Sequence, residues 1–154
     1  MLIMAAVIPL MELVADACQR MPLPAWLETY ALQTKAEQDA LLALMMDVEG
    51  VGGWTALVSL MCVMTAVSEE ALFRCALLRC FVAPADRSQA GWKRIVGIAL
   101  AVGLLFAACH GDVYGFVPRM LLGALFVGLV WRTGSVWPAV MAHAVNNLCA
   151  LLMM

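Results

Sequence analysis

Apolar residues fill four long stretches of the chain after residue 52, and short polar segments separate them. The stretches cover residues 53–81, 95–110, 116–131 and 136–154. A helix needs roughly 20 predominantly apolar residues to cross a bilayer. The second and third stretches are shorter than this, so their helices are expected to extend into the flanking residues. The pattern predicts a bundle of about four transmembrane helices.

The N-terminal third of the chain has a different pattern. Residues 1–17 are apolar but contain one proline and two acidic residues, which favours a short or interfacial helix. Residues 18–50 are the most polar part, and their apolar residues recur at helical spacing with acidic residues between them. This predicts an amphipathic helix on the membrane surface, ended by the glycines at 50–53. We therefore divide the chain into an N-terminal region, 1–52, and a helical core, 53–154.

The composition supports an all-α membrane protein. Of the 154 residues, 65% are hydrophobic and only 13% are charged, whereas about a quarter of a soluble domain is charged. The net charge of −2 is too small to suggest a nucleic acid as a partner. Six cysteines show no CxxC spacing, so we expect buried thiols in helices instead of disulfides or a zinc site.

Ionisable and amide side chains are rare inside the apolar stretches, which makes each of them a candidate for function. A charge near the middle of a bilayer costs at least about 2.5–3.5 kcal/mol on insertion scales. A residue that remains there needs a partner or a chemical role. The candidates are Glu69, Glu70, Arg74, His110, Arg119, His143, Asn146 and Asn147.

The sequence SEEALFRCALL places two adjacent carboxylates and an arginine in the first apolar helix. Glu70 and Arg74 are four positions apart, in the order that favours a helical ion pair. Glu69 points about 100° away from Glu70 on a helix of 3.6 residues per turn, so it cannot easily share that pair. Glu69 therefore needs a cation, a proton or a water network. The alternative is a structural role, in which the three residues lock helices together.

Two further motifs supply polar groups from other helices. FAACH carries Phe106 and His110 one turn apart, and HAVNN carries His143 and Asn147 at the same spacing. Peptide hydrolysis needs an activated water and donors for the developing oxyanion. Glu69 and His110 could activate the water, while His143 and Asn147 could each offer an N–H group. Hydrogen bonding between helices is the simpler alternative for the histidines.

A metal centre is a second chemical option for the same residues. Glu69, His110 and His143 could bind a divalent metal such as zinc, which would activate a bound water. The chain has two histidines and no HExxH motif, which excludes the zincin arrangement. It also has no GxSxG motif, which argues against a serine-type protease. A metal ion and a metal-free water both remain open from the sequence.

In order, the motifs EExxxR, FxxxH and HxxxN resemble those of the CPBP family, the bacterial relatives of the eukaryotic CAAX prenyl protease. The stretch LLGALFVGLVWRTGSVWPAVMAHAVNN is also similar to this family, and the resemblance covers about residues 55–150. It implies an intramembrane endopeptidase in the inner membrane of a bacterium. The implied roles are water activation by Glu69 and His110, an oxyanion site at His143 and Asn147, and support from Glu70, Arg74 and Phe106.

The expected partners are the lipid bilayer and a membrane-anchored protein or hydrophobic peptide as substrate. The main alternative is a non-catalytic membrane protein for bacteriocin immunity or scaffolding, which the resemblance does not exclude. A proton or ion carrier is a third possibility, but the last two apolar stretches hold no acidic residue for a relay. Close helix packing, within the chain or between chains, is expected at Ala124 and Gly128, which form a small-xxx-small pair.

Overall fold

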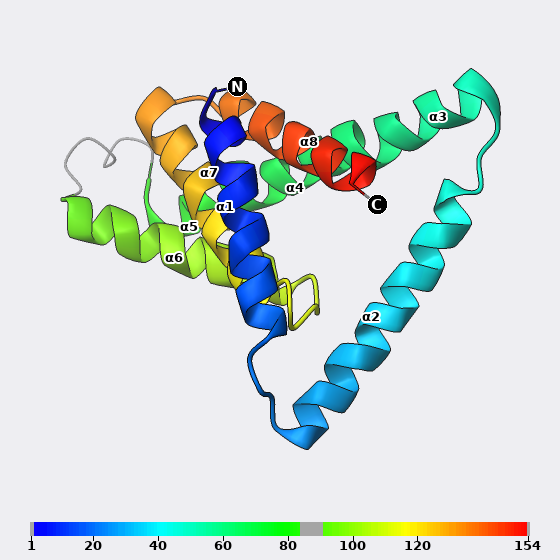
Figure 1. The fold of residues 1–154 in the computed structure, drawn as a ribbon. Coiled ribbons are helices and arrows are strands. Elements are labelled where there is room, and N and C mark those ends of the chain that lie inside the picture. Colours follow the sequence, from blue (N-terminus) through cyan, green and yellow to red (C-terminus); the bar gives the residue numbers. More distant parts are fainter. Residues whose placement is uncertain (1, 84–90, 154) are drawn as a thin grey trace.

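The computed structural model describes residues 2–83 and 91–153 (Figure 1). The structure is 85% helical, and no β-strand occurs in these two ranges. The all-α fold predicted from the apolar stretches is therefore confirmed.

The EEALFR motif lies on a continuous helix of 32 residues that runs from Gly50 to Phe81. Two π-helical segments divide this long helix into three α-helical parts. In chain order the segments are α3 (Gly50–Val58), η1 (Ser59–Met64), α4 (Thr65–Glu70), η2 (Ala71–Leu77) and α5 (Leu78–Phe81). The other helices are α1 (Leu2–Gln19), α2 (Ala25–Met46), α6 (Trp92–Ala108), α7 (Phe116–Thr133) and α8 (Trp137–Leu152).

The start of the long helix differs from the expectation. The preceding helix, α2, already ends at Met46, and Gly50 begins α3 with a φ of +67°. Glycine adopts this left-handed conformation at little cost, so Gly50 suits the turn between the two helices. The glycines at 52 and 53 were expected to end the amphipathic helix, but they lie inside the long helix instead.

Two helices of the described residues are long and apolar enough to cross a membrane. They are Gly50–Phe81 and Phe116–Thr133. The helices α6 and α8 have 17 and 16 residues, which is at or below the shortest usual span of about 17 residues. Of the roughly four transmembrane helices predicted, length and composition thus support two in the described part of the chain.

The helices α6 and α7 come into direct backbone contact at Gly103 and Gly123. A Cβ atom on Gly103 would overlap the carbonyl oxygen of Met120, and one on Gly123 would lie 2.9 Å from the Cα atom of Gly103. Ala124 lies beside Gly103, but Gly128 faces open space. The close contact within the chain therefore includes Ala124 of the predicted pair and also Gly123, which was not predicted. Gly128 takes no part in it.

The apolar core lies between the long helix and the helices α6 to α8. It includes Phe73, Leu78, Val102, Phe106, Leu122, Phe126, Val127, Val130 and Ala139. The first helix, α1, packs against α7 and α8 and adds Met4 to this core, so it belongs to the bundle (Figure 1). Because lipid tails are as apolar as these side chains, close packing stabilises the bundle more than exclusion of water does.

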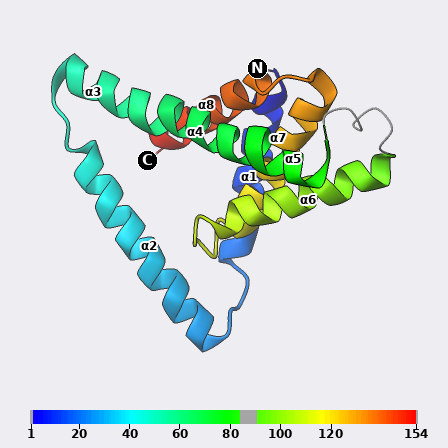
Figure 2. The ribbon, with the colours of Figure 1, turned by 180° about the vertical axis from the view of Figure 1, so that it is seen from behind.

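The helix α2 extends away from the bundle, as both ribbon views show (Figures 1 and 2). Within α2, which is described throughout, only Ala31 is buried. Its neighbour Tyr30 donates a hydrogen bond from Oη to the carbonyl of Gly111, at 3.4 Å. The helix predicted in the polar region is thus present, and its position on a membrane surface stays a prediction.

Candidate active site

The two adjacent carboxylates of the EEALFR motif lie in different surroundings, because α4 turns by about 100° per residue. The side chain of Glu70 is fully buried, whereas that of Glu69 is 25% exposed. This is the division expected from the helical geometry. Each carboxylate therefore has its own set of partners.

Glu70 is the centre of a buried charge cluster. Its Oε1 atom lies 3.0 Å from Nη1 of Arg74 and 2.8 Å from Nδ1 of His143. Arg74 also donates from Nη2 to the carbonyl of Gly123 on α7, at 3.0 Å. The spacing within the motif indicated the pair of Glu70 and Arg74. The contact with His143 was missed, since it joins residues 73 positions apart.

Three aromatic rings surround the guanidinium of Arg74. Its Cζ atom lies 5.7, 4.9 and 5.3 Å from the ring centroids of Phe73, Phe106 and Phe126. Such cation–π contacts contribute about 2 kcal/mol where water is excluded. Phe126 also stacks on His143, with ring centroids 5.2 Å apart. Phe126 was not predicted as a site residue, and nothing in its apolar surroundings in the sequence singles it out.

Glu69 lies between the two histidines of the chain. Its Oε2 atom is 3.8 Å from Nε2 of His110 and 3.7 Å from Nε2 of His143. The same oxygen is buried and has no hydrogen-bond partner among the described residues. Burying a carboxylate oxygen without a partner is costly, so such an atom calls for an explanation.

Hydrogen bonds at Nδ1 determine which ring nitrogen of each histidine carries the proton. Nδ1 of His110 is 2.8 Å from the carbonyl oxygen of Phe106, which can only accept. Nδ1 of His143 faces the Glu70 carboxylate in the same way. Both rings therefore donate from Nδ1, and in the neutral form each presents a lone pair at Nε2 toward Glu69.

Asn147 is hydrogen-bonded to the backbone of the long helix. Its Nδ2 atom donates to the carbonyl of Met61 in the π-helical segment η1, at 3.3 Å. Both Asn147 and His143 lie on α8, which begins at Trp137 with a proline near its start. Proline is favoured in the first turn of a helix, where its missing N–H is not needed.

The residues predicted to be catalytic line one cavity of about 340 Å³. It is bordered by the long helix, by α8, by His110 after α6, by Arg119 on α7 and by one residue of α2. Its lining residues are Leu42, Met61, Thr65, Glu69, His110, Arg119, His143, Asn147, Ala150 and Leu151. The structure thus brings together Glu69, His110, His143 and Asn147 from three separate helical regions.

The metal alternative for Glu69, His110 and His143 finds no support. Within residues 2–83 and 91–153, no three side chains of His, Cys, Asp or Glu are arranged to hold a metal ion. We therefore derive no chemical step through a metal. All six cysteines lie within these ranges and are free. Cys18 and Cys62 are buried as expected, whereas Cys80 and Cys109 are exposed, so the prediction of buried thiols was wrong for these two.

A second arginine lies beside the cavity and was not included in the predicted site. Arg119, on the first turn of α7, is paired with Asp112 in the loop before this helix, with Nη1 2.5 Å from Oδ2. Burial acts to raise the pKa of the Asp112 carboxyl. Hydrogen bonds from Arg119 and from the backbone of Gly115 and Tyr114 outweigh burial, so this pKa lies below its usual value.

These features define an all-helical protein with a carboxylate, two imidazoles and an amide around one cavity among apolar helices. The model of the type II CAAX prenyl endopeptidase Rce1-like family matches residues 52–149, which is well over half of the chain, and the chain belongs to this family. No curated protein and no solved structure gave a match. Family membership confirms the resemblance seen in the motifs. It also supports a CAAX-type protease that is embedded in a membrane and acts on membrane-associated peptides.

Proposed function

We propose that this chain is an intramembrane endopeptidase in which Glu69 and His110 activate a water and His143 and Asn147 hold the oxyanion. The position of Glu69 is the observation that supports this most directly. Its carboxylate oxygen lies between two imidazole nitrogens, on the wall of a cavity, without a hydrogen bond. Pairing with Arg74 does not explain this oxygen, because Glu70 already takes that role.

The distances around Glu69 suit a bridging water better than direct contacts. Separations of 3.7 and 3.8 Å are too long for hydrogen bonds between these groups. Polar groups at such distances are often linked by a water molecule. A water there can donate one proton to Glu69 and the other to Nε2 of His110. Its oxygen lone pairs then face the cavity, where a substrate carbonyl carbon would lie.

His143 acts as an oxyanion donor only when both of its ring nitrogens carry a proton, because its Nδ1–H group is used by Glu70. Asn147 has two amide N–H groups, one for the long helix and one for the oxyanion.

The proposed reaction moves one proton in two steps. As the water attacks the carbonyl carbon, its proton moves to Glu69, and His143 and Asn147 stabilise the oxyanion. When the C–N bond breaks, Glu69 gives the proton to the departing amine and returns to the carboxylate form. Glu70 and Arg74 do not touch the reacting atoms in this scheme. They fix the orientation of the His143 ring.

Cleavage of a library of quenched fluorescent peptides by the purified protein tests this proposal. Glu69→Gln keeps the shape of the side chain but removes the base, and we expect activity to fall by about 10²–10⁴-fold. Asn147→Ala should lower activity by roughly 10²–10³-fold, as the loss of an oxyanion donor does. Glu28→Gln, the same substitution at an exposed position of α2, is the matched control and should retain full activity.

A chelator added in parallel tests the metal-free mechanism. We expect the rate to be unchanged, because the described residues offer no cluster that could hold a metal ion. Loss of activity with the chelator would contradict this mechanism, and full activity of Glu69→Gln would exclude Glu69 as the base. If the wild-type protein cleaves nothing in a broad library, the non-catalytic role in immunity or scaffolding is favoured instead.

A further inference from the structure

The hydroxyl of Thr65, in the long helix, bonds differently from those of the other threonines. All five threonines of the chain lie in the described residues, and each donates from Oγ1 to a carbonyl of its own helix. In four of them this carbonyl lies four residues back, the usual way in which a helix satisfies the hydroxyl: Thr29, Thr34, Thr55 and Thr133. Thr65 instead donates to the carbonyl of Leu60, five residues back, at 3.0 Å.

The main chain of Thr65 bonds in the same way as its hydroxyl. Its N–H group reaches the carbonyl of Leu60 and also that of Cys62, three residues back. It passes over the carbonyl of Met61, which lies four residues back and would be its acceptor in an α-helix. Thr65 thus bonds Leu60 through both its hydroxyl and its N–H group, and it closes the π-helical segment η1. Single π-helical turns of this kind are frequent at functional sites.

The carbonyl that Thr65 passes over is the one that Asn147 uses. The Nδ2 atom of Asn147 donates to the carbonyl of Met61, at 3.3 Å. Apolar side chains bring the two helices together at the same place, since Cys62 of η1 and Leu151 of α8 belong to one small buried cluster. The hydrogen bond between η1 and α8 is therefore made where the π-helical turn departs from the α-helical pattern.

The bond to Met61 decides which end of the Asn147 amide faces which partner. A carbonyl oxygen only accepts, so the NH₂ end of the amide must lie against η1. An amide turned over would place its own oxygen against that of Met61 and would lose the bond. The choice matters because Asn147 lines the cavity that contains Glu69, where an oxyanion needs a donor and is repelled by an oxygen.

We propose that Thr65 is a positioning residue, which holds the π-helical turn η1 and, through the carbonyl of Met61, orients the amide of Asn147 for the oxyanion. This inference rests on the function proposed above. The Thr65 hydroxyl does not act on the reacting atoms, because its proton is used by Leu60. Without the hydroxyl, the hold on Leu60 is weaker. The N–H group of residue 65 then shifts toward Met61, its α-helical acceptor, and competes with Asn147 for that carbonyl.

A simpler role for Thr65 is that its hydroxyl only needs an acceptor inside an apolar helix. That need is met by the carbonyl four residues back, as Thr55 shows on the same long helix. It does not account for the bond to Leu60, nor for the use of the carbonyl passed over by Asn147. The two roles differ in their effect on Asn147, because a hydroxyl that is merely satisfied has no influence on that amide.

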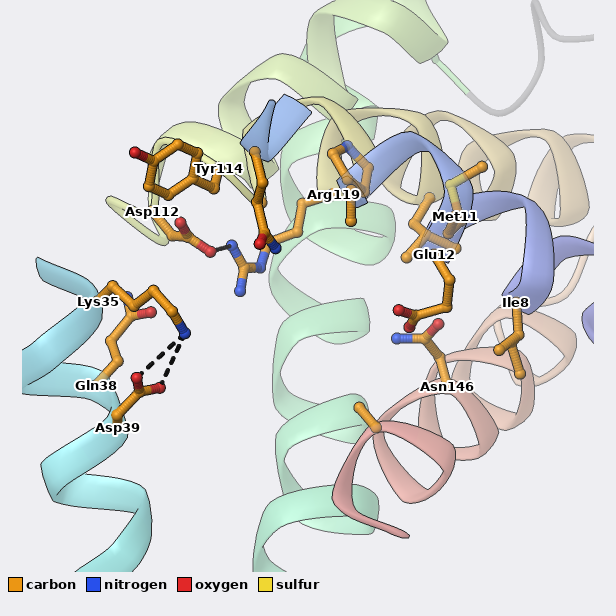
Figure 3. Close-up of a pocket in the computed structure, with 16 residues that line it drawn as sticks. Ile8, Met11, Glu12, Lys35, Gln38, Asp39, Asp112, Tyr114, Arg119 and Asn146 are labelled. Atoms are coloured by element: carbon orange, nitrogen blue, oxygen red, sulfur yellow. Dashed lines mark hydrogen bonds and ion pairs between the residues drawn. The ribbon is translucent and has the colours of Figure 1, made fainter. Parts of the chain in front are cut away.

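The chain has two asparagines, so protein labelled with ¹⁵N at asparagine alone gives only two pairs of side-chain amide signals in NMR spectra. Asn147→Ala assigns the pair of Asn147. Asn146 is the internal reference, because its amide points toward the Glu12 carboxylate in a second cavity of about 350 Å³ between α1, α2, α7 and α8 (Figure 3).

The measurement is the rate at which these amide protons exchange with water. We expect Thr65→Val to raise the rate for Asn147 roughly twofold to tenfold, the size of one net hydrogen bond, and to leave that of Asn146 unchanged. Thr65→Ser keeps the hydroxyl and should keep the slow exchange. Thr55→Val is the matched control, since it removes an ordinary hydroxyl bond from the same helix.

Peptide cleavage provides a second readout. Thr65→Val should lower kcat about tenfold and leave KM unchanged, because the oxyanion is held only in the transition state. The loss should be smaller than that of Asn147→Ala, and Thr65→Ser should reverse it. In Asn147→Ala protein, adding Thr65→Val should change kcat by less than about twofold, because its effect passes through the missing amide. A raised KM at unchanged kcat would indicate direct contact of Thr65 with the substrate and overturn the inference.

The exchange measurement needs no activity, so it separates a failure of this inference from a failure of the proposed function. Unchanged exchange of Asn147 in Thr65→Val overturns the inference, and so does equally faster exchange of both asparagines, which would indicate general loosening. Faster exchange of Asn147 alone supports it, even if full activity of Glu69→Gln contradicts the proposed function. If Thr65→Val melts far below the wild type, Thr65→Ala also lacks the hydroxyl and provides the same comparison.

Discussion

The molecule contains two arginine–carboxylate pairs that share one chemistry but differ in their surroundings. Arg74 and Glu70 are fully buried, and the guanidinium also contacts a backbone carbonyl and three aromatic rings. Arg119 and Asp112 are 32% and 18% exposed and border two cavities. The first pair is enclosed by the bundle, whereas the second leaves part of its guanidinium open.

This difference indicates separate roles for the two arginines. A buried ion pair is destabilising when one partner is lost, because the other charge is left without compensation. A partly exposed pair contributes little to stability, since water can replace either partner. We therefore expect the Arg74 pair to stabilise the fold around the site and the Arg119 pair to contribute little to stability. Three measurements test this contrast.

The largest effect is expected for Arg74→Gln. It removes the cation from Glu70 inside the bundle, and we expect a loss of about 3–5 kcal/mol in the free energy of unfolding. Thermal melting in detergent measures this loss, with the exposed Arg132→Gln as the control. A melting temperature of Arg74→Gln equal to that of Arg119→Gln would remove the contrast between the two pairs.

A smaller loss is expected for Gly123→Ala. The new Cβ atom would lie 2.9 Å from the Cα atom of Gly103 and 3.2 Å from the Phe106 ring, so the two helices must separate. Overpacking of this kind costs about 1–3 kcal/mol, and it also shifts the carbonyl that accepts from Arg74. Gly128→Ala on the same helix meets open space and is the matched control. Equal melting temperatures of the two variants would argue against the tight contact.

The smallest effect concerns the pH dependence of the open pair. The pKa of Asp112 is lower in the folded protein than its ordinary value of 3.8, so the ionised carboxylate favours folding. This stabilisation is fully present above the ordinary value and is lost as the pH falls through the lower folded pKa. Because the pair is partly exposed, we expect at most about 1 kcal/mol. Melting temperatures should fall less steeply between pH 5 and pH 3 in Asp112→Asn than in the wild type. Identical slopes would show that this pair does not contribute.

Much of the fold could be predicted because the bilayer restricts what an apolar stretch can form. Each of the four stretches contains a helix, and their bounds moved by only a few residues, as from 53–81 to Gly50–Phe81. The contact of Gly103 with Gly123 could not be predicted, because it depends on how two helices align. The small-residue spacing pointed to Gly128, which lies on another side of α7.

The site could be predicted as far as its residues lie within one helix or match a motif. The different environments of Glu69 and Glu70 follow from the turn of α4, and the family motifs named His110, His143 and Asn147. Contacts between helices were not predictable in this way. The shared Glu70 carboxylate and the ring of Phe126 are examples, since only the folded bundle brings them to His143.

The two π-helical segments have a consequence for how the faces of the long helix are assigned. Hydrogen bonds in such segments span five residues instead of four, so side chains no longer recur at the period of an α-helix. A helical wheel drawn across the whole helix would place its two ends wrongly relative to each other. The faces must therefore be assigned separately in each α-helical part of the long helix, which are Gly50–Val58, Thr65–Glu70 and Leu78–Phe81. A sequence with one residue fewer between Ser59 and Met64 would keep every motif. If that segment then returned to a regular α-helix, the face that carries Trp54 would nearly keep its direction, because the tighter turn offsets the lost residue.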